Sequence, residues 1–306
     1  MDLDLKLVAE GFQFPEGPIA MADGSVVLVE IERKTLTRVA PDGTTSVIAE
    51  VGGGPNGAAI GPDGAVYICN NGGAFQFQKM NGMNVPGATP PSHTGGMIQR
   101  VDLKTGAVTT LYDACDGRRL IGPNDLVFDK SGAFWFTDHG CSTPEGRKFG
   151  GLYYAKADGS KILRVLRELI SPNGVGLSPD GKTVYYAETF TGRLWSLPLI
   201  KQGKPAKVAG FTPGVFVGAF PGIAYFDSLG VQADGGVCCA TILAGGITTF
   251  GPVAGKVKHT PIPDPLVTNI CWGGKGMKTA YITASGTGKL IAMDWPKPGL
   301  RLNYNA

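Results

Sequence analysis

The chain has 306 residues and a formal charge of +3, and its Lys and Arg residues do not gather into a long basic run. That distribution argues against a nucleic-acid-binding protein, which would carry a basic stripe. No apolar stretch approaches a membrane span, and the 47 glycines and 22 prolines are typical of short strands joined by tight turns.

The first residues, MDLDLKLVAEG, alternate polar and apolar side chains and lack the basic start and apolar run of a signal peptide. Six cysteines are scattered along the chain without a C-x-x-C pair, and several lie in apolar, strand-like runs. We therefore expect reduced, structural thiols and a cytoplasmic protein.

One short phrase recurs six times along the chain, and each copy carries a polar residue near its start. The copies are PEGPIAMADG, PNGAAIGPDG, PNDLVFDKSG, PNGVGLSPDG, FDSLGVQADG and TNICWGGKGM. The polar residues, called the register residues below, are Glu16, Asn56, Asn124, Asn173, Asp227 and Asn269. In the first five copies a glycine follows eight residues later, and in the sixth that place is Met277.

Each phrase is followed by a β-rich run such as SVVLVE or AFWFTD and then by alternating strands separated by turn pairs such as Asp42–Gly43. Six units of four antiparallel strands predict an all-β, six-bladed β-propeller formed by a single domain, 1–306. KILRVLRELI follows a turn and is predicted as the outermost strand of blade three. LDLKLVAEG is predicted to close the ring in the last blade. The insertion at about 74–96 has the length of a functional or disordered loop.

In a propeller the first strand of each blade lines the central channel, so the register residues should converge at one end. The residues that end the second strands should rim the same mouth: Glu30, Asn70, Asn71, Asp138, His139, Glu188, Thr241 and Thr283. Burying carboxylates there without partners costs several kcal/mol each, and Ca²⁺ or Mg²⁺ would remove that cost. The alternative is that the asparagines cap turns.

The phrases PEGP, GPNDLVFDKSGAFWFTD, SPNGVGLSPDGKTVYYAET and NICWGG resemble the SMP-30/gluconolactonase/LRE-like family of six-bladed propellers over essentially the whole chain. The resemblance implies one divalent cation, with Ca²⁺ favoured and Zn²⁺, Mg²⁺ or Mn²⁺ as alternatives. Its implied ligands are Glu16, Asn124, Asn173 and Asp227. It also implies that Asn124 contacts the substrate, and that Asn56 and Asn269 face the substrate or support the ligands. Gly122 stands where sugar lactonases often carry arginine.

The expected reaction is the attack of water on the carbonyl of a small-molecule lactone polarised by the cation. Asp227 is the candidate general base, and His139 is a second acid or base because imidazole titrates near neutrality. The alternative for His139 is a rim histidine bonded to a loop carbonyl. Asp138 and Trp272 are expected to contact the substrate. The predicted wall is apolar and favours a less polar lactone or ester; it consists of Phe75, Phe77, Met80, Met83, Phe149, Phe216, Phe220 and Trp272.

Three other functions stay open, because a fold does not determine a reaction. The first is hydrolysis of organophosphates or phosphotriesters on the same scaffold, and the second is a metal-assisted isomerase or lyase. The third is a non-enzymatic, calcium-binding propeller. A dinucleotide site is not expected, because the G-x-G-x-x-G match at 52–57 is followed by a strand and a turn where such a site needs a helix.

Overall fold

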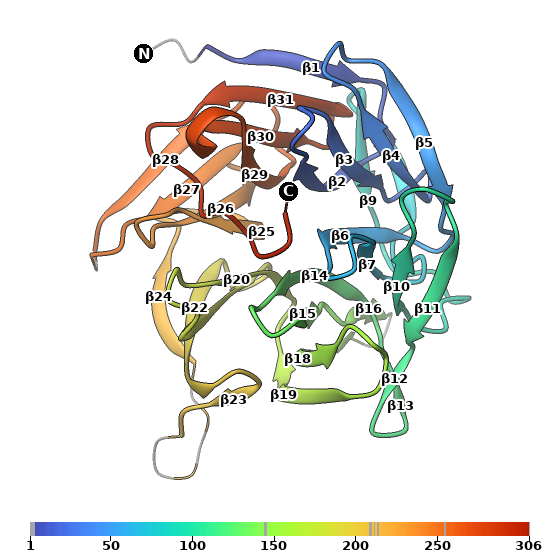
Figure 1. The fold of residues 1–306 in the computed structure, drawn as a ribbon, viewed down its shortest axis with the longest axis vertical. Helices are drawn as coiled ribbons and strands as arrows, with labels where there is room; N and C mark the ends of the chain where they lie inside the picture. Colours follow the sequence, from blue (N-terminus) through green and yellow to red (C-terminus); the bar gives the residue numbers. More distant parts are fainter. Residues whose placement is uncertain are drawn as a thin grey trace.

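A computed structural model describes residues 4–143, 146–207, 210, 212, 214–253 and 255–305. Six antiparallel sheets of four or five strands are arranged around a central axis, as Figure 1 shows. This confirms the predicted all-β, six-bladed propeller. In the described residues the one helical element is the 3₁₀ turn η1 (Lys275–Met277). The described residues therefore contain no helix that is long and apolar enough to cross a membrane.

Blades one to three follow one another along the first 169 residues. Blade one contains β2 (Pro15–Ala20), β3 (Val26–Glu30), β4 (Thr35–Val39) and β5 (Thr45–Glu50). Blade two contains β6 (Pro55–Ile60), β7 (Val66–Asn70), β10 (Met97–Val101) and β11 (Val108–Tyr112). Blade three contains β14 (Pro123–Phe128), β15 (Ala133–Asp138), β18 (Gly150–Lys156) and β19 (Ile162–Leu169). Strand β19 lies in KILRVLRELI, so the prediction of an outermost strand there is confirmed.

Blades four to six complete the ring. Blade four contains β20 (Pro172–Leu177), β21 (Thr183–Glu188), β22 (Arg193–Lys201), β24 (Val215–Ala219) and the short β23 (Lys204–Pro205). Blade five contains β25 (Tyr225–Val231), β26 (Val237–Ile242), β27 (Gly246–Phe250) and β28 (Val257–Pro261). Blade six contains β29 (Val267–Gly273), β30 (Thr279–Ala284), β31 (Lys289–Asp294) and β1 (Lys6–Glu10). Because β1 pairs with β31, the N-terminal strand closes the ring as predicted.

Among the described residues, three two-stranded hairpins stand outside the blades. They are β8 (Phe77–Met80) with β9 (Met83–Pro86), β12 (Ala114–Cys115) with β13 (Arg118–Arg119), and β16 (Cys141–Thr143) with β17 (Gly146–Lys148). The first belongs to the predicted insertion at 74–96. The first and third both follow the second strand of a blade, so both rise from the same end of the propeller.

The core lies between adjacent blades, and burial decreases from the axis outward. In blade one every residue of β3 is buried, whereas most of β5 is exposed. Between blades two and three, Tyr67 packs on Phe128 with ring centroids 5.0 Å apart. Second strands such as β3 (VVLVE) are accordingly mainly apolar, as expected for strands covered on both faces.

Each first strand carries a β-bulge at the register residue. The pairing shifts between Glu16 and Ile19, and the same shift recurs at 55–58, 123–126, 172–175, 226–229 and 267–269. A bulge redirects the side chain it contains. The neighbouring backbones also approach closely, because a Cβ on Gly174 would lie 2.4 Å from the Leu229 amide nitrogen. The glycines after several register residues reflect this crowding at the axis.

The register assigned to blade six is wrong by one residue. Val267 pairs with Ala284 and Asn269 with Thr283, and Ile270 then pairs with Ile282, so the extra residue of this strand is Thr268. In blade two, the corresponding interval between Pro55 and Ala58 holds Asn56 and then Gly57. Thr268 is therefore the structural counterpart of Asn56, and Asn269 is the counterpart of Gly57. The glycine rule then holds in all six blades, because Gly276 follows Thr268 by eight residues and adopts a φ of 69°.

The carboxyl-terminal segment crosses the other end of the channel, at the carboxyl ends of the first strands. The Leu300 amide donates to the Val231 carbonyl at 2.8 Å, and the Asn303 side chain donates to the Phe128 carbonyl at 2.9 Å. Figure 1 shows the C-terminus close to the centre of the ring. This segment borders a small internal cavity of about 70 Å³, so the wider pocket lies where the first strands begin.

Candidate functional site

Five register residues converge on one pocket of about 280 Å³ at the start of the first strands. They are Glu16, Asn56, Asn124, Asn173 and Asp227, and all are buried. The sixth position does not contribute, because the Thr268 hydroxyl is used within the protein, at 2.8 Å from the Thr283 hydroxyl and 2.5 Å from the Ser285 hydroxyl. The pocket is therefore surrounded by two carboxyl groups and three amides.

Glu16 is held in place by one of its two carboxylate oxygens. Oε2 accepts hydrogen bonds from the Gly17 amide and from the Asn269 side chain, both at 2.7 Å. Oε1 is buried and has no hydrogen-bond partner among the described residues. Desolvation, and then the nearby charge of Asp227, raise the pKa of Glu16 well above its usual range. Asn269 thus positions Glu16. It borders the small cavity and is not among the residues that line the pocket, so the structure supports the supporting role expected for it and not the contact with substrate.

Asp227 and a third carboxyl group, Asp125, lie close enough to influence each other. Desolvation raises the pKa of Asp227 to about 7, and the charge of Asp125 adds to the shift. Burial likewise raises the pKa of Asp125 to about 7. Sequence reasoning missed Asp125, although it directly follows Asn124. Its Oδ1 accepts from the Leu126 amide at 2.8 Å, and it borders the small cavity below the pocket.

The two predicted amide ligands have carbonyl oxygens that the protein leaves largely unused. Asn173 donates through Nδ2 to the Thr189 hydroxyl at 3.1 Å, and its Oδ1 receives only a long contact of 3.5 Å from Ser228. The Oδ1 atom of Asn124 is buried without a partner among the described residues. Both amides can therefore offer an oxygen to the pocket.

These four residues fit a hard divalent cation. Carboxylate and amide oxygens are the ligands that Ca²⁺ prefers, and a buried acceptor without a donor is costly unless something occupies it. Glu16 Oε1 and Asn124 Oδ1 are two such acceptors. Within the described ranges no three His, Cys, Asp or Glu side chains group together as a metal site. The amides are therefore needed to complete this ligand set.

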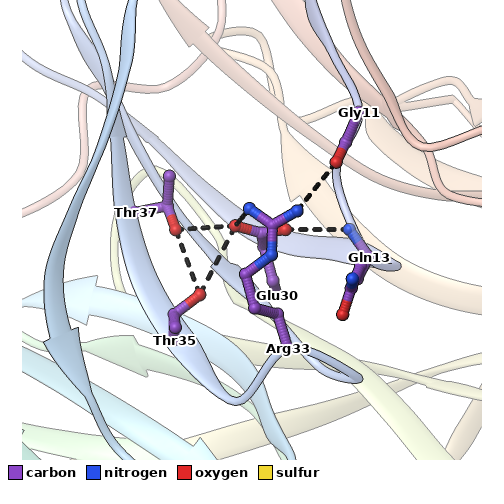
Figure 2. A network of polar contacts seen from close by, with 6 residues as sticks. All are labelled: Gly11, Gln13, Glu30, Arg33, Thr35 and Thr37. Atoms are coloured by element: carbon purple, nitrogen blue, oxygen red, sulfur yellow. Dashed lines mark hydrogen bonds and ion pairs between the residues drawn. The ribbon is translucent and has the colours of Figure 1, made fainter.

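The residues that end the second strands have a structural role. Figure 2 shows Glu30 accepting hydrogen bonds from the Gln13 amide, Arg33, Thr35 and Thr37. Amides 16 to 18 residues earlier in the chain are held in the same way by Asn70, Asp138 and Glu188. Each of these side chains fastens the segment that enters its own blade.

This arrangement corrects two expectations. Asp138 was predicted to contact the substrate, but its carboxylate is occupied by the amides of Ile121, Gly122 and Gly140 at 2.7 to 2.9 Å. The predicted second tier of oxygen ligands is also wrong, because these side chains turn into the blades. From that tier, His139 is among the residues that border the pocket.

His139 lies in the pocket wall as a neutral imidazole. Its Nδ1 is 3.0 Å from Nη2 of Arg147, which can only donate, so the ring proton is assigned to Nε2. Burial, and then the charge of Arg147, lower the pKa of His139 to about 3. The geometry therefore argues against His139 as a general base and leaves its Nε2–H as a donor. Sequence reasoning missed Arg147 because it lies in the β16–β17 hairpin, outside the repeat.

The pocket wall is apolar, as expected, but it consists of different residues. Of the eight wall residues predicted, Phe75 lines the pocket. Phe216 packs on Trp195 in the outer part of blade four, and Met80 and Phe149 are about half exposed. The other wall residues found in the structure are Phe14, Ile31, Val85, Pro86, Phe190, Tyr225, Ile242, Leu243 and Leu266.

Trp272 is also displaced from the predicted site. It lies in the core of blade six, with its ring centroid 6.3 Å from that of Trp295, and it borders the small cavity at the far end. A Cβ on Gly299 would lie 2.4 Å from its ring, which shows how tightly the carboxyl-terminal segment covers it. It is therefore placed to stabilise packing at the far end.

Comparison with known proteins gives three findings. The profile of the SMP-30/gluconolactonase/LRE-like region matches residues 14–286. A gluconolactonase of Zymomonas mobilis is 26% identical over 92% of this chain and 79% of its own, and a lactonase of Staphylococcus saprophyticus is 27% identical over 94% and 80%. The structure of regucalcin from Agrobacterium tumefaciens, described as a calcium-binding protein, superimposes with a TM-score of 0.73 at 19% identity over 98% of both chains.

Proposed function

Because the chain belongs to the SMP-30/gluconolactonase/LRE-like family, we propose that it is a divalent-metal-dependent lactonase, a hydrolase of the EC 3.1.1 class. Two named relatives with lactonase activity support the choice of reaction. The observation that carries the proposal is the set of buried oxygen acceptors around the pocket, two of which lack any donor in the described part of the chain.

We infer that Glu16, Asn124, Asn173 and Asp227 hold one divalent cation, with Ca²⁺ favoured because all four supply oxygen. A structural neighbour that is described as calcium-binding supports this assignment. When bound, the cation supplies Lewis-acid polarisation of the substrate carbonyl and compensates the negative charge that develops on its oxygen.

The protein's own residues account for the proton movements. Asp227 accepts a proton from the water that adds to the carbonyl carbon, and the position of its carboxyl group in the pocket supports this role. When the ring C–O bond breaks, Asp227 returns the proton to the departing alkoxide oxygen. The Nε2–H of His139 donates a hydrogen bond to a substrate oxygen, and Asn56 offers a further polar contact.

The apolar wall would govern which lactones enter. Phe14, Phe75 and Phe190 exclude water from the substrate and strengthen the polar interactions inside. A wall of this kind favours a lactone of low polarity over a heavily hydroxylated sugar lactone. The β8–β9 insertion contributes Val85 and Pro86 to it.

A substrate panel tests the proposal. The purified protein with Ca²⁺ is given dihydrocoumarin, γ-butyrolactone, gluconolactone, an aryl acetate and a phosphotriester, and acid release is followed with a pH indicator. We expect opening of the lactones, with the less polar ones favoured. Turnover of the phosphotriester alone would replace the proposal with the first alternative. Calcium binding without any turnover would favour a non-enzymatic propeller.

A further inference from the structure

The pocket wall contains a half-buried positive charge that forms no ion pair with the described residues. Arg147 borders the pocket and is about half buried, with its guanidinium 4.8 Å above the ring of Phe190. No carboxylate of the described residues lies within ion-pair distance of it. The charge of Asp138 acts on Arg147 from a distance, and its carboxylate is hydrogen-bonded to backbone amides.

The hydrogen bonds of Arg147 leave part of its donor capacity unused. Nη2 donates to His139 at both Nδ1 and the carbonyl oxygen, and Nη1 donates to the Ser142 hydroxyl at 3.2 Å. A guanidinium has five N–H groups, so Nε–H and the second Nη1–H have no acceptor among the described residues. The three bonds are all to neutral groups, so none compensates the charge.

The N–H groups that Arg147 leaves free point to an anionic ligand. Glu16 and Asp227 are assigned to the divalent cation, Asp138 is bonded to backbone amides, and Asp125 borders the small cavity, so none of these carboxyl groups pairs directly with Arg147. The aromatic rings of Phe75 and Phe190 lie beside His139, with centroid distances of 6.1 and 6.0 Å, and form part of the wall at this corner. An anion bound beside Arg147 would pair with its charge and accept hydrogen bonds from its free N–H groups.

We propose that Arg147 selects lactones that carry a carboxylate substituent on the ring, which it binds through its guanidinium. This inference rests on the proposed lactonase function and narrows its substrate class to lactones whose ring is of low polarity apart from one carboxylate, so that the apolar wall would contact the ring and Arg147 the substituent. Guanidinium and carboxylate form strong, directional pairs, and the fixed contacts of Arg147 to His139 and Ser142 reduce the ordering required on binding.

A matched pair of substrates tests the inference. The γ-lactone of 2-hydroxyglutarate carries one free carboxylate, and its methyl ester has nearly the same shape without the charge. We expect the protein to prefer the acid in kcat/KM. Arg147→Met should reduce the acid-to-ester ratio by about 10- to 100-fold, the range for losing a charge-assisted contact. Arg147→Lys should retain part of the preference.

The control is Lys148→Met, which removes the same charge from an exposed neighbour in the same hairpin and should leave the ratio unchanged. A ratio that Arg147→Met leaves unchanged, or a wild-type protein that prefers the ester, would overturn the inference. Because the readout is a ratio, a general loss of activity through His139 does not affect it. Arg147→Gln serves if the Met variant does not fold.

A binding measurement separates this inference from the proposed function. If no lactone is opened, the proposed function fails, and calorimetric titration with 3-oxocyclopentanecarboxylate then tests Arg147 alone. This carbocyclic ketone cannot be hydrolysed. Affinity that falls about 10-fold or more in Arg147→Met, and not in Lys148→Met, supports the carboxylate site. Equal affinity in the wild type and Arg147→Met contradicts it.

Discussion

Replacing each of two buried glutamates of blade one by glutamine should change the stability of the protein in a different way. Glu16 and Glu30 are both nearly inaccessible to solvent, yet one faces the pocket and the other fastens the backbone. We predict that Glu16→Gln removes the stabilisation by the divalent cation and leaves the metal-free protein as stable as before. We predict that Glu30→Gln destabilises the protein equally with and without the cation.

The hydrogen bonds give the size of each effect. In Glu16→Gln the new amide oxygen can accept from Gly17 and Asn269, and the new NH₂ occupies the place of Oε1, which has no partner among the described residues. The metal-free protein therefore loses little. A 100-fold loss of cation affinity would reduce the cation's stabilisation by about 2.7 kcal/mol.

In Glu30→Gln the new NH₂ group would face a hydrogen-bond donor whichever of the two carboxylate oxygens it replaces. Oε1 accepts from Arg33 at 3.1 Å and Thr37 at 2.8 Å, and Oε2 accepts from the Gln13 amide at 2.8 Å. Since hydrogen bonds to charged groups contribute about 1.5–3 kcal/mol each, Glu30→Gln should cost about 2–4 kcal/mol. That corresponds to a fall in Tm of roughly 4–16 °C, at about 2–4 °C per kcal/mol for a domain of this size class.

Thermal unfolding of the wild type and both variants, in EDTA and in millimolar Ca²⁺, measures both effects. The expected pattern is a Ca²⁺-dependent rise in Tm for the wild type and for Glu30→Gln, and none for Glu16→Gln. If Glu16→Gln lowers Tm in EDTA as much as Glu30→Gln does, Glu16 is a structural residue and the assignment of the cation site is wrong.

Three further predictions concern residues around the pocket. Asp138→Asn should destabilise the protein by about 1–3 kcal/mol in urea titrations and leave KM within about twofold, because its carboxylate binds backbone amides; a larger KM effect would return it to the substrate site. The pKa of His139 is about 3 in the folded protein and near 6.5 in the unfolded chain, so the free energy of unfolding decreases as pH falls below about 6.5. His139→Gln should reduce this decrease between pH 7.5 and 5.5 by about 1 kcal/mol. An unchanged decrease would contradict the assignment of a neutral imidazole. Gly57→Ala should lower expression and Tm, because its Cβ would lie 2.6 Å from the Asn124 carbonyl oxygen; a variant as stable as the wild type would show that the axis is less crowded.

The repeat carried most of what could be predicted. A cyclic fold makes equal sequence positions equal in space, so one polar residue per phrase was enough to bring Glu16, Asn124, Asn173 and Asp227 to one pocket. The number of blades, the outer strand β19 and the ring closure by β1 follow from the same periodicity. The single register error, Asn269 for Thr268, arose because an asparagine was preferred over the glycine spacing, which Gly276 satisfies.

Contacts outside the repeat depend on the tertiary structure. Alternation along a strand predicts which face a side chain takes but does not identify its partner, so the bonds of Asp138 and Glu188 to backbone amides of the segments entering their own blades could not be predicted. Arg147 reaches His139 because the hairpin between β15 and β18 folds back over the pocket. This hairpin is an insertion outside the repeat. The repeat therefore could not predict the effect of Arg147 on the imidazole of His139 or the positive charge that Arg147 brings to the pocket wall.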